Sequence, residues 1–146
     1  MLQERIQHGS VYDNNYLYAI GGENGSVMDE CERLSLSEDR WEDLPDLPKS
    51  CGNMSAVVVK QTQCLYTLGG WGNKYVLDLI QRLCLVRLEW DVMPIRLPGT
   101  ADFIACFNQD ESRVCFVAGD KLYCLNALTE CSITLIKHVG NIESVC

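Results

Sequence analysis

The histidines, carboxylates and cysteines of this sequence could do chemistry, but their spacing gives catalysis little support. The two histidines, His8 and His138, lie far apart, and neither stands in a metal-binding motif. Asp29 and Glu30 are adjacent carboxylates, but neighbours on a strand point to opposite faces. No Cys-x-x-Cys, His-x-His or Gly-x-Ser-x-Gly pattern occurs. We therefore expect no catalytic residue, no bound metal and no cofactor.

Cysteine is unusually abundant, and its count is odd, so at least one thiol stays unpaired in a monomer. The sequence begins Met1-Leu2-Gln3-Glu4-Arg5, which is charged at once and is not followed by the apolar run of a secretory signal. Both features predict a reducing compartment, the cytoplasm, and mostly buried thiols. The nine are Cys31, Cys51, Cys64, Cys84, Cys106, Cys115, Cys124, Cys131 and Cys146.

Two of these cysteines are candidates for a redox switch. If the chain turns at Asp110-Glu111, Cys106 and Cys115 face each other across a hairpin, where a disulfide could form. The alternative is that they are two small buried side chains packing together. A shift of the strand register by one residue would also separate them.

Charge excludes two classes of partner. The net charge is −8 and the isoelectric point about 4.6, so the chain lacks the basic face that nucleic acids or an anionic membrane require. Most of the acid lies between Glu23 and Asp46, where nine acidic residues outnumber Arg33 and Arg40. This window is either a dock for a basic partner or a solvated face that protects exposed strand edges.

The elements that position these residues form a repeat of about 48 residues. Gly21-Gly22 ends an apolar run, Gly69-Gly70 ends a second one 48 residues later, and Ala118-Gly119 ends a third 49 residues after that. Trp41 and Trp90 also recur 49 residues apart. The repeats span residues of about 5–48, 53–98 and 102–135.

Each repeat predicts four short antiparallel strands, which in the second lie near Met54–Lys60, Cys64–Leu68, Leu79–Leu85 and Glu89–Met93. Polar turns join the first two strands of each repeat at residues 13–15, 61–63 and 110–112. Val76, Leu79, Ile80 and Leu83 have helical spacing, but the equivalent residues 31–36 are strand-like. We therefore expect a strand there, and an all-β chain.

The Gly-Gly pairs, with a Trp 19 or 20 residues later and a Leu-Pro or Met-Pro step after it, resemble the kelch repeat of β-propellers. The resemblance implies three four-stranded antiparallel blades of an incomplete propeller over residues 1–146. The third blade is degenerate, because Ala118 replaces a glycine and no Trp follows Gly119. Leu34 and Leu83 also stand where the family often has Tyr.

Three blades do not close a ring, since propellers use four to eight. The open sides would expose apolar faces, which soluble monomers rarely tolerate. Either the chain is a fragment of a longer kelch protein, which we favour, or a second copy completes a six-bladed ring by self-association.

In proteins that this sequence resembles, partners commonly bind the face formed by the loops after Gly-Gly and the loops that lead into the next blade. Trp71 is an interface anchor if its side chain is exposed, and packing if it folds over the glycines. The candidate partner-binding residues are Glu23, Asn24, Ser26, Lys49, Ser50, Asn53, Trp71, Asn73, Lys74, Tyr75, Thr100, Asp102, Asp120 and Lys121.

We accordingly predict a protein–protein interaction module, a kelch-type adaptor or scaffold. Relatives that join kelch blades to a BTB or F-box module suggest the substrate-recognition part of a ubiquitin-ligase adaptor. The alternative from another class is a propeller enzyme resembling the copper-dependent galactose oxidase. That chemistry needs converging Tyr and His ligands, for which this sequence provides no motif.

Overall fold

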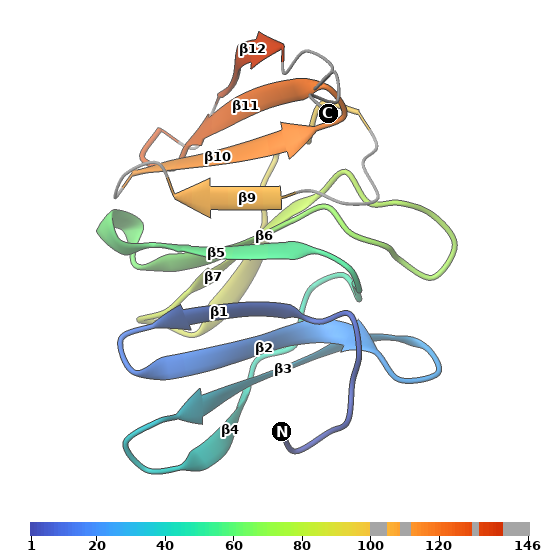
Figure 1. Cartoon of the computed structure of the whole chain (residues 1–146). Helices are drawn as coiled ribbons and strands as arrows, with labels where there is room; N and C mark the ends of the chain where they lie inside the picture. The colour runs from blue at the N-terminus through green and yellow to red at the C-terminus, as the bar shows by residue number, and fades with distance from the viewer. Residues whose placement is uncertain (100–104, 109–111, 130–131, 139–146) are drawn as a thin grey trace, which may run out of the picture.

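The chain folds into three four-stranded antiparallel sheets (Figure 1). The structure, a computed structural model, describes residues 1–99, 105–108, 112–129 and 132–138. No α-helix occurs within those ranges; the one helical element is a short 3₁₀ turn, η1 (Lys60–Thr62). Nor does any helix there have the length and apolar character needed to cross a lipid bilayer.

Each sheet runs in chain order, so every strand pairs with its sequence neighbours. The first sheet holds β1 (Gly9–Asp13), β2 (Tyr16–Glu23), β3 (Val27–Ser35) and β4 (Arg40–Leu44). The second holds β5 (Ser55–Val59), β6 (Cys64–Leu68), β7 (Ile80–Cys84) and β8 (Glu89–Val92). The third holds β9 (Ala105–Asn108), β10 (Arg113–Ala118), β11 (Lys121–Asn126) and β12 (Ile133–His138).

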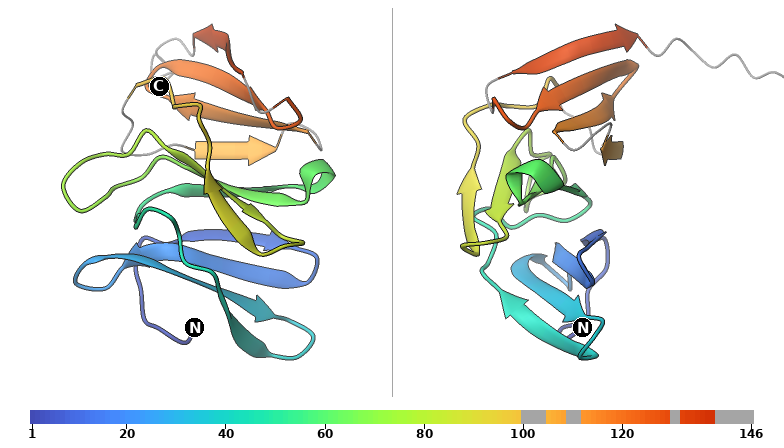
Figure 2. Two further views of the ribbon diagram at one scale, coloured as in Figure 1. Left: turned by 180° about the vertical axis from the view of Figure 1, so that it is seen from behind. Right: turned by 90° about the vertical axis from the view of Figure 1, so that its left-hand side faces the viewer.

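The sheets stack face to face as three blades of an incomplete propeller (Figure 2). The first strand of each blade, β1, β5 or β9, lies beside the first strand of the next one. The all-β fold and the three antiparallel blades predicted from the sequence are thus confirmed. The stretch with helical spacing is also resolved in favour of a strand, since Ile80 and Leu83 lie in β7.

Two apolar cores lie between the blades, and the second blade contributes to both. Leu65 points toward the first blade, where it packs with Ile20, whereas Tyr66 points toward the third blade and packs with Phe116. Successive residues of a strand point to opposite faces, so a strand covered on both faces is buried along its whole length. This explains why all five residues of β6 are buried.

Trp90 lies at the boundary between the first two blades. Its partly buried ring packs against the core that these blades share, and its Nε1–H donates a hydrogen bond of 2.8 Å to the carbonyl oxygen of Pro45. Trp41, the equivalent residue of the first repeat, lies on the outer face of the first blade instead. There it lines a hollow of about 250 Å³ together with Met1, His8 and Leu17.

The register of the third blade corrects one expectation. Cys115 lies opposite Phe107, and Cys106 opposite Phe116, so the predicted pairing of Cys106 with Cys115 is wrong by one residue. A one-residue slip turns opposed side chains to different faces of the sheet. The predicted turn at residues 110–112 lies largely outside the described residues.

Candidate functional site

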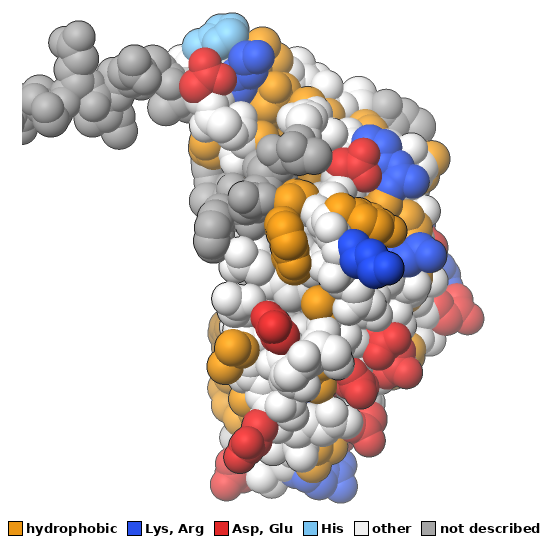
Figure 3. Space-filling model, turned by 90° about the vertical axis from the view of Figure 1, so that its right-hand side faces the viewer, with side chains coloured by type: hydrophobic (Ala, Val, Ile, Leu, Met, Phe, Trp, Pro, Cys, Tyr) orange, Lys and Arg blue, Asp and Glu red, His pale blue; other side chains and the backbone are white. Residues whose placement is uncertain are grey.

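The site lies on the side of the molecule that we call the loop face. It comprises the β2–β3 loop, the β6–β7 loop, the β10–β11 turn and the linker from β4 to β5, all on the right in Figure 1. Figure 3 views this side: hydrophobic and basic side chains gather in its middle, over the second blade, and acidic ones lie over the first blade below. The acidic protein therefore presents a local basic and aromatic patch.

Five of the predicted residues come together around one shallow hollow of about 240 Å³. They come from two segments that are far apart in the sequence, the β4–β5 linker and the β6–β7 loop. No acidic side chain contributes to its lining. The lining residues are Lys49, Ser50, Gly72, Asn73, Lys74, Tyr75 and Leu77.

Two aromatic side chains of the β6–β7 loop face solvent. Trp71 is 46% exposed and Tyr75 is 67% exposed, which is high for residues of this size. Exposed aromatic side chains on a rigid backbone are the usual anchors of protein interfaces. This exposure favours the anchor over the alternative, in which the Trp71 ring packs over the glycines.

Backbone hydrogen bonds fix this loop. The amide of Trp71 donates to the carbonyl oxygen of Gly52 at 2.7 Å, and the amide of Gly52 donates to the carbonyl oxygen of Trp71 at 3.0 Å. Within the loop, Gly72 donates to Tyr75 at 3.0 Å and Leu77 donates to Gly70 at 2.8 Å. The linker and the loop are therefore tied into one unit before any partner arrives.

Gln81, a residue that was not predicted from the sequence, positions Lys49. Its side-chain Oε1 accepts a hydrogen bond of 2.9 Å from the amide of Lys49, and its Nε2 donates one of 3.1 Å to the Lys49 carbonyl oxygen. Gln81 is 1% exposed and is the second residue of β7, between Ile80 and Arg82. A buried amide there needs polar partners, and the linker main chain supplies them.

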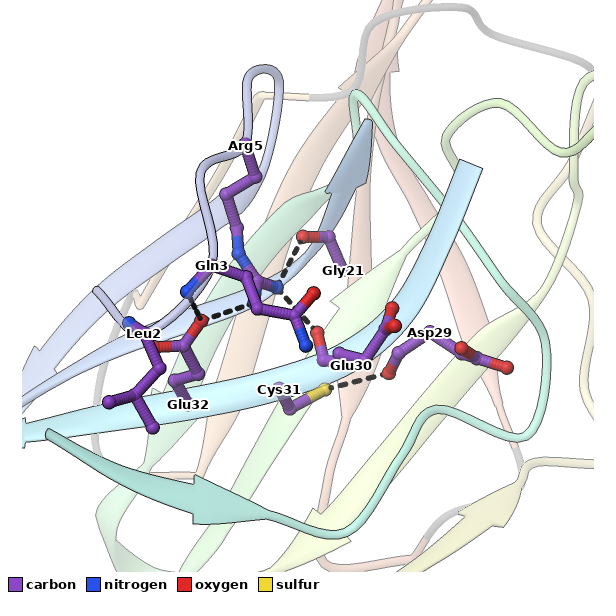
Figure 4. A network of polar contacts seen from close by, with 8 residues as sticks. All are labelled: Leu2, Gln3, Arg5, Gly21, Asp29, Glu30, Cys31 and Glu32. Carbon is purple, nitrogen blue, oxygen red and sulfur yellow. Dashed lines mark hydrogen bonds and ion pairs between the residues drawn. The ribbon is translucent and has the colours of Figure 1, made fainter. Parts of the chain in front are cut away.

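Glu32 holds the same repeat position in the first blade, 49 residues before Gln81. It accepts hydrogen bonds from the amides of Leu2 at 2.6 Å and Gln3 at 3.3 Å, and it forms a buried ion pair with Arg5 (Figure 4). Arg5 also donates to the carbonyl oxygens of Gly21, at 2.9 Å, and Glu30, at 2.6 Å. In both blades, then, a polar residue of the third strand fixes the segment that leads into the blade.

The other predicted residues lie apart from the hollow with Lys49. Glu23 and Asn24 line a separate hollow of about 220 Å³ with Glu4, Arg5 and Ile6. Ser26 is exposed in the β2–β3 loop, and Asn53 has a left-handed φ of 59° and donates from its amide to Gln7 at 2.7 Å. Asp120 and Lys121 lie at the β10–β11 turn, where Asp120 is 3.8 Å from His138. Thr100 and Asp102 lie outside the described residues.

A second, larger hollow of about 520 Å³ adjoins the first and shares Lys49, Tyr75 and Leu77 with it. Its far wall carries Arg96, which forms an exposed ion pair of 3.4 Å with Asp78. Arg96 follows the Met-Pro step of the second repeat, and that position in the motif was the one signal that could have indicated it.

The opposite face also has a hollow, of about 270 Å³, between the first two blades. Its one arginine is already engaged: Arg33 lies 4.4 Å from the centre of the Tyr16 ring and donates to Glu42 at 2.8 Å. Hydrogen bonds from Arg33 and Arg40 hold the pKa of the Glu42 carboxyl below its usual value. Among the described residues, no group of three or more His, Cys, Asp or Glu side chains could hold a metal ion.

Comparison with known proteins adds a family context. The family model described as the kelch motif matches residues 4–48. A kelch repeat-containing protein of Dictyostelium discoideum is 35% identical over an alignment of 91 residues, and the match covers 58% of this chain and 14% of that protein. The kelch repeat and BTB domain-containing protein 2 of ectromelia virus is 23% identical over 141 residues, covering 84% of this chain and 25% of the viral protein.

A third relative is the kelch domain-containing protein 10 of Xenopus laevis, which is 25% identical over an alignment of 113 residues; the match covers 69% of this chain and 26% of that protein. The chain thus spans about a quarter or less of the length of each of these relatives.

Proposed function

Because this chain belongs to the kelch-repeat family, we propose that it is a protein-interaction module that binds its partner through the loop face of its second blade. The observation that carries the proposal is the hollow lined by Lys49, Lys74 and the exposed Tyr75, with the exposed Trp71 on the same loop. Aromatic anchors supply contact area, and the two lysines supply charge.

The chemistry of the hollow selects a class of partner. Lys49 and Lys74 line it without any acidic neighbour in the lining, and Leu77 gives it an apolar floor. A segment that carries a carboxylate next to an apolar or aromatic side chain would satisfy both features. The preformed backbone of the site lowers the ordering cost of binding, because the loop is held by hydrogen bonds in the free protein.

A random-peptide library selected on the purified chain tests this proposal, because such a selection does not require an identified partner. We expect selected peptides to be enriched in acidic residues next to apolar ones. Trp71→Ala, Tyr75→Ala and Lys49→Ala should each weaken their binding, with losses of about 1 kcal/mol or more for the aromatic anchors. Val86→Ala is the matched control, because Val86 is exposed on the opposite face. Peptides that bind all these variants as they bind the parent chain would contradict the proposed site.

The role of the module is proposed at a broader level as an adaptor or scaffold in the cytoplasm. The viral relative carries a BTB domain by name. Joined to a module of that kind, the loop face would serve as the substrate-recognition part of a ubiquitin-ligase adaptor. The abundance of cysteine, with nine in 146 residues, supports a reducing compartment in which thiols persist.

The outer face of the first blade supports a second contact, with a further blade. Trp90 meets the linker of the blade before it, while Trp41 faces outward over a hollow. The missing blade comes from a second copy of the chain or from the rest of a longer one. Light scattering separates the two: a compact dimer that Trp41→Glu dissociates indicates self-association, and a monomer assigns the blade to a longer chain. In that complete protein Trp41→Glu should be destabilising, and unchanged stability would contradict the contact.

A further inference from the structure

Cys64 and Cys84 face each other directly in neighbouring strands. They are register partners in the antiparallel pair β6–β7, so their side chains lie on the same face of the second blade. Each of the two thiols contributes to the shift in the other's pKa. Opposed residues of an antiparallel pair have Cβ atoms roughly 4.5–5.5 Å apart, and a disulfide needs about 3.5–4.5 Å. A small approach of the two strands is therefore enough to join them.

The two thiols differ in their surroundings. Cys84 is the last residue of β7, is partly exposed, and precedes the turn to β8. The backbone N–H of Arg87, and then that of Val86, hydrogen-bond to its sulfur and lower the pKa of the Cys84 thiol. Cys64 is buried behind it, donates to the carbonyl oxygen of Thr62 at 3.2 Å, and has its pKa raised by burial.

A second opposed pair shows what distinguishes the first. Cys115 and Cys124 are register partners in β10 and β11, yet they are only 3% and 6% exposed. An oxidant in water reaches a thiol only if the sulfur is accessible and part of it is ionised. Cys84 meets both conditions, while Cys115 and Cys124 share its geometry without its access.

We propose that Cys64 and Cys84 are a peroxide-sensitive pair, in which Cys84 is oxidised first and Cys64 then closes a disulfide. In the first step the Cys84 thiolate attacks one oxygen of hydrogen peroxide. An S–O bond forms, the O–O bond breaks, and the departing hydroxide takes up a proton to become water. The product is the Cys84 sulfenic acid.

In the second step the Cys64 sulfur attacks the sulfenic sulfur of Cys84. An S–S bond forms, the S–O bond breaks, and the hydroxyl group leaves as water with the proton from Cys64. Two thiols and one hydrogen peroxide thus give one disulfide and two waters. A thiol reductant reverses the reaction and restores both cysteines.

Tryptic peptide mapping of the peroxide-treated, folded chain tests the proposal. Cleavage after Lys60, Lys74, Arg82 and Arg87 places Cys64 and Cys84 alone in the separate peptides 61–74 and 83–87. Under non-reducing conditions we expect these two peptides to appear joined, and to separate again after reduction. The Cys115 peptide, 114–121, should remain unjoined under the same treatment and is the internal control.

Two variants separate the roles of the thiols. In Cys64→Ser the sulfenic acid of Cys84 has no resolving thiol, so dimedone, which labels sulfenic acids, should accumulate on peptide 83–87. In Cys84→Ser no dimedone label should appear on Cys64. The proposal is overturned if peptides 61–74 and 83–87 stay separate while the chain remains folded. Equal labelling of Cys64 and Cys84 in the two variants would also overturn it.

Discussion

The thiol of Cys51 donates a hydrogen bond of 3.1 Å to the carbonyl oxygen of Gly69. Cys51 belongs to the linker that leaves the first blade, and Gly69 begins the Gly-Gly pair of the second. The contact brings this linker against the backbone at the end of β6, where the next glycine has no room for a side chain. A Cβ on Gly70 would lie 2.5 Å from the Cys51 sulfur and 2.6 Å from the Gly52 carbonyl oxygen.

Gly70→Ala is therefore expected to destabilise the protein by about 2 kcal/mol or more, since it combines a steric clash with a φ of 99°. Chemical denaturation gives the free energy of unfolding. Gly25→Ala is the control: its φ is also positive, at 73°, but no atom lies within 4 Å of the added Cβ. It should cost about 1 kcal/mol. Equal losses in the two variants would show that close approach is not what requires glycine at position 70.

Removal of the Arg5 side chain should leave the buried Glu32 carboxylate without its charged partner. We expect Arg5→Ala to lower the free energy of unfolding by roughly 3 kcal/mol, as for other broken buried ion pairs. The comparison is Arg40→Ala, whose pairs with Glu38 and Glu42 are exposed to solvent. That substitution should cost less than about 1 kcal/mol. A loss for Arg5→Ala no greater than that for Arg40→Ala would contradict a structural role for the pair.

Gln81→Leu should release the main chain of Lys49, because leucine has a similar volume but offers neither hydrogen bond. We expect a loss of about 1–3 kcal/mol in stability, together with weaker binding of peptides selected on the loop face. Gln61→Leu makes the same chemical change at an exposed position and should have little effect on either measurement. If the Lys49 amide is as well protected from hydrogen exchange in Gln81→Leu as in the parent chain, the two hydrogen bonds from Gln81 do not hold the linker.

Alkylation with iodoacetamide should distinguish the thiols by their surroundings. Burial raises the pKa values of Cys31 and Cys51 to about 12, whereas turn amides lower the pKa of Cys84. At pH 8 we therefore expect Cys84 to react well before Cys31 and Cys51, because the thiolate is the reactive form. Mass spectrometry of tryptic peptides over time gives the rates. In denaturant all three rates should converge, and a Cys84 rate no faster than theirs in the native chain would count against the assigned environment.

Alkaline pH should weaken the fold through the same buried thiols. The pKa values of Cys31 and Cys51 in the folded chain, about 12, lie above their ordinary value of 9.0, so the unfolded chain loses these protons first. The stability they contribute is complete below about pH 9 and declines as the pH rises toward 12. The double variant Cys31→Ala, Cys51→Ala should show a shallower decline of unfolding free energy over this range. Parallel curves would contradict the assignment.

The repeat made most of the fold predictable, because its period outweighs weak local signals. Val76 to Leu83 has helical spacing, and only its alignment with residues 31–36 identified a strand. By contrast, the pairing of Cys106 depended on a turn whose length the sequence does not specify, and one residue of error exchanged Cys106 for Phe107 opposite Cys115. The directly opposed pair Cys64 and Cys84 was overlooked because β6 and β7 are joined by a long loop, which hides their register.

The sequence predicted which surface of the molecule carries the candidate site, but not which residues lie together there. Gly-Gly marked where the β6–β7 loop begins, which placed Trp71 and Tyr75 on the loop face. The contacts between the linker and that loop depend on how two blades stack. Local sequence patterns do not specify this stacking. Gln81 shows this best: its place in a strand is predictable from the repeat, but its hydrogen-bond partner, 32 residues away, is not.

The two hydrogen bonds between the Gln81 side chain and the Lys49 main chain have a practical consequence for engineering. Gln81 forms hydrogen bonds with the main chain of residue 49 and with no atom of its side chain. The buried residue Gln81 therefore fixes the position of the linker main chain, while the side chain at position 49 can be replaced. A diversified library at positions 49, 50 and 73–75, built over an unchanged Gln81, would convert this blade into a scaffold for selecting new recognition surfaces.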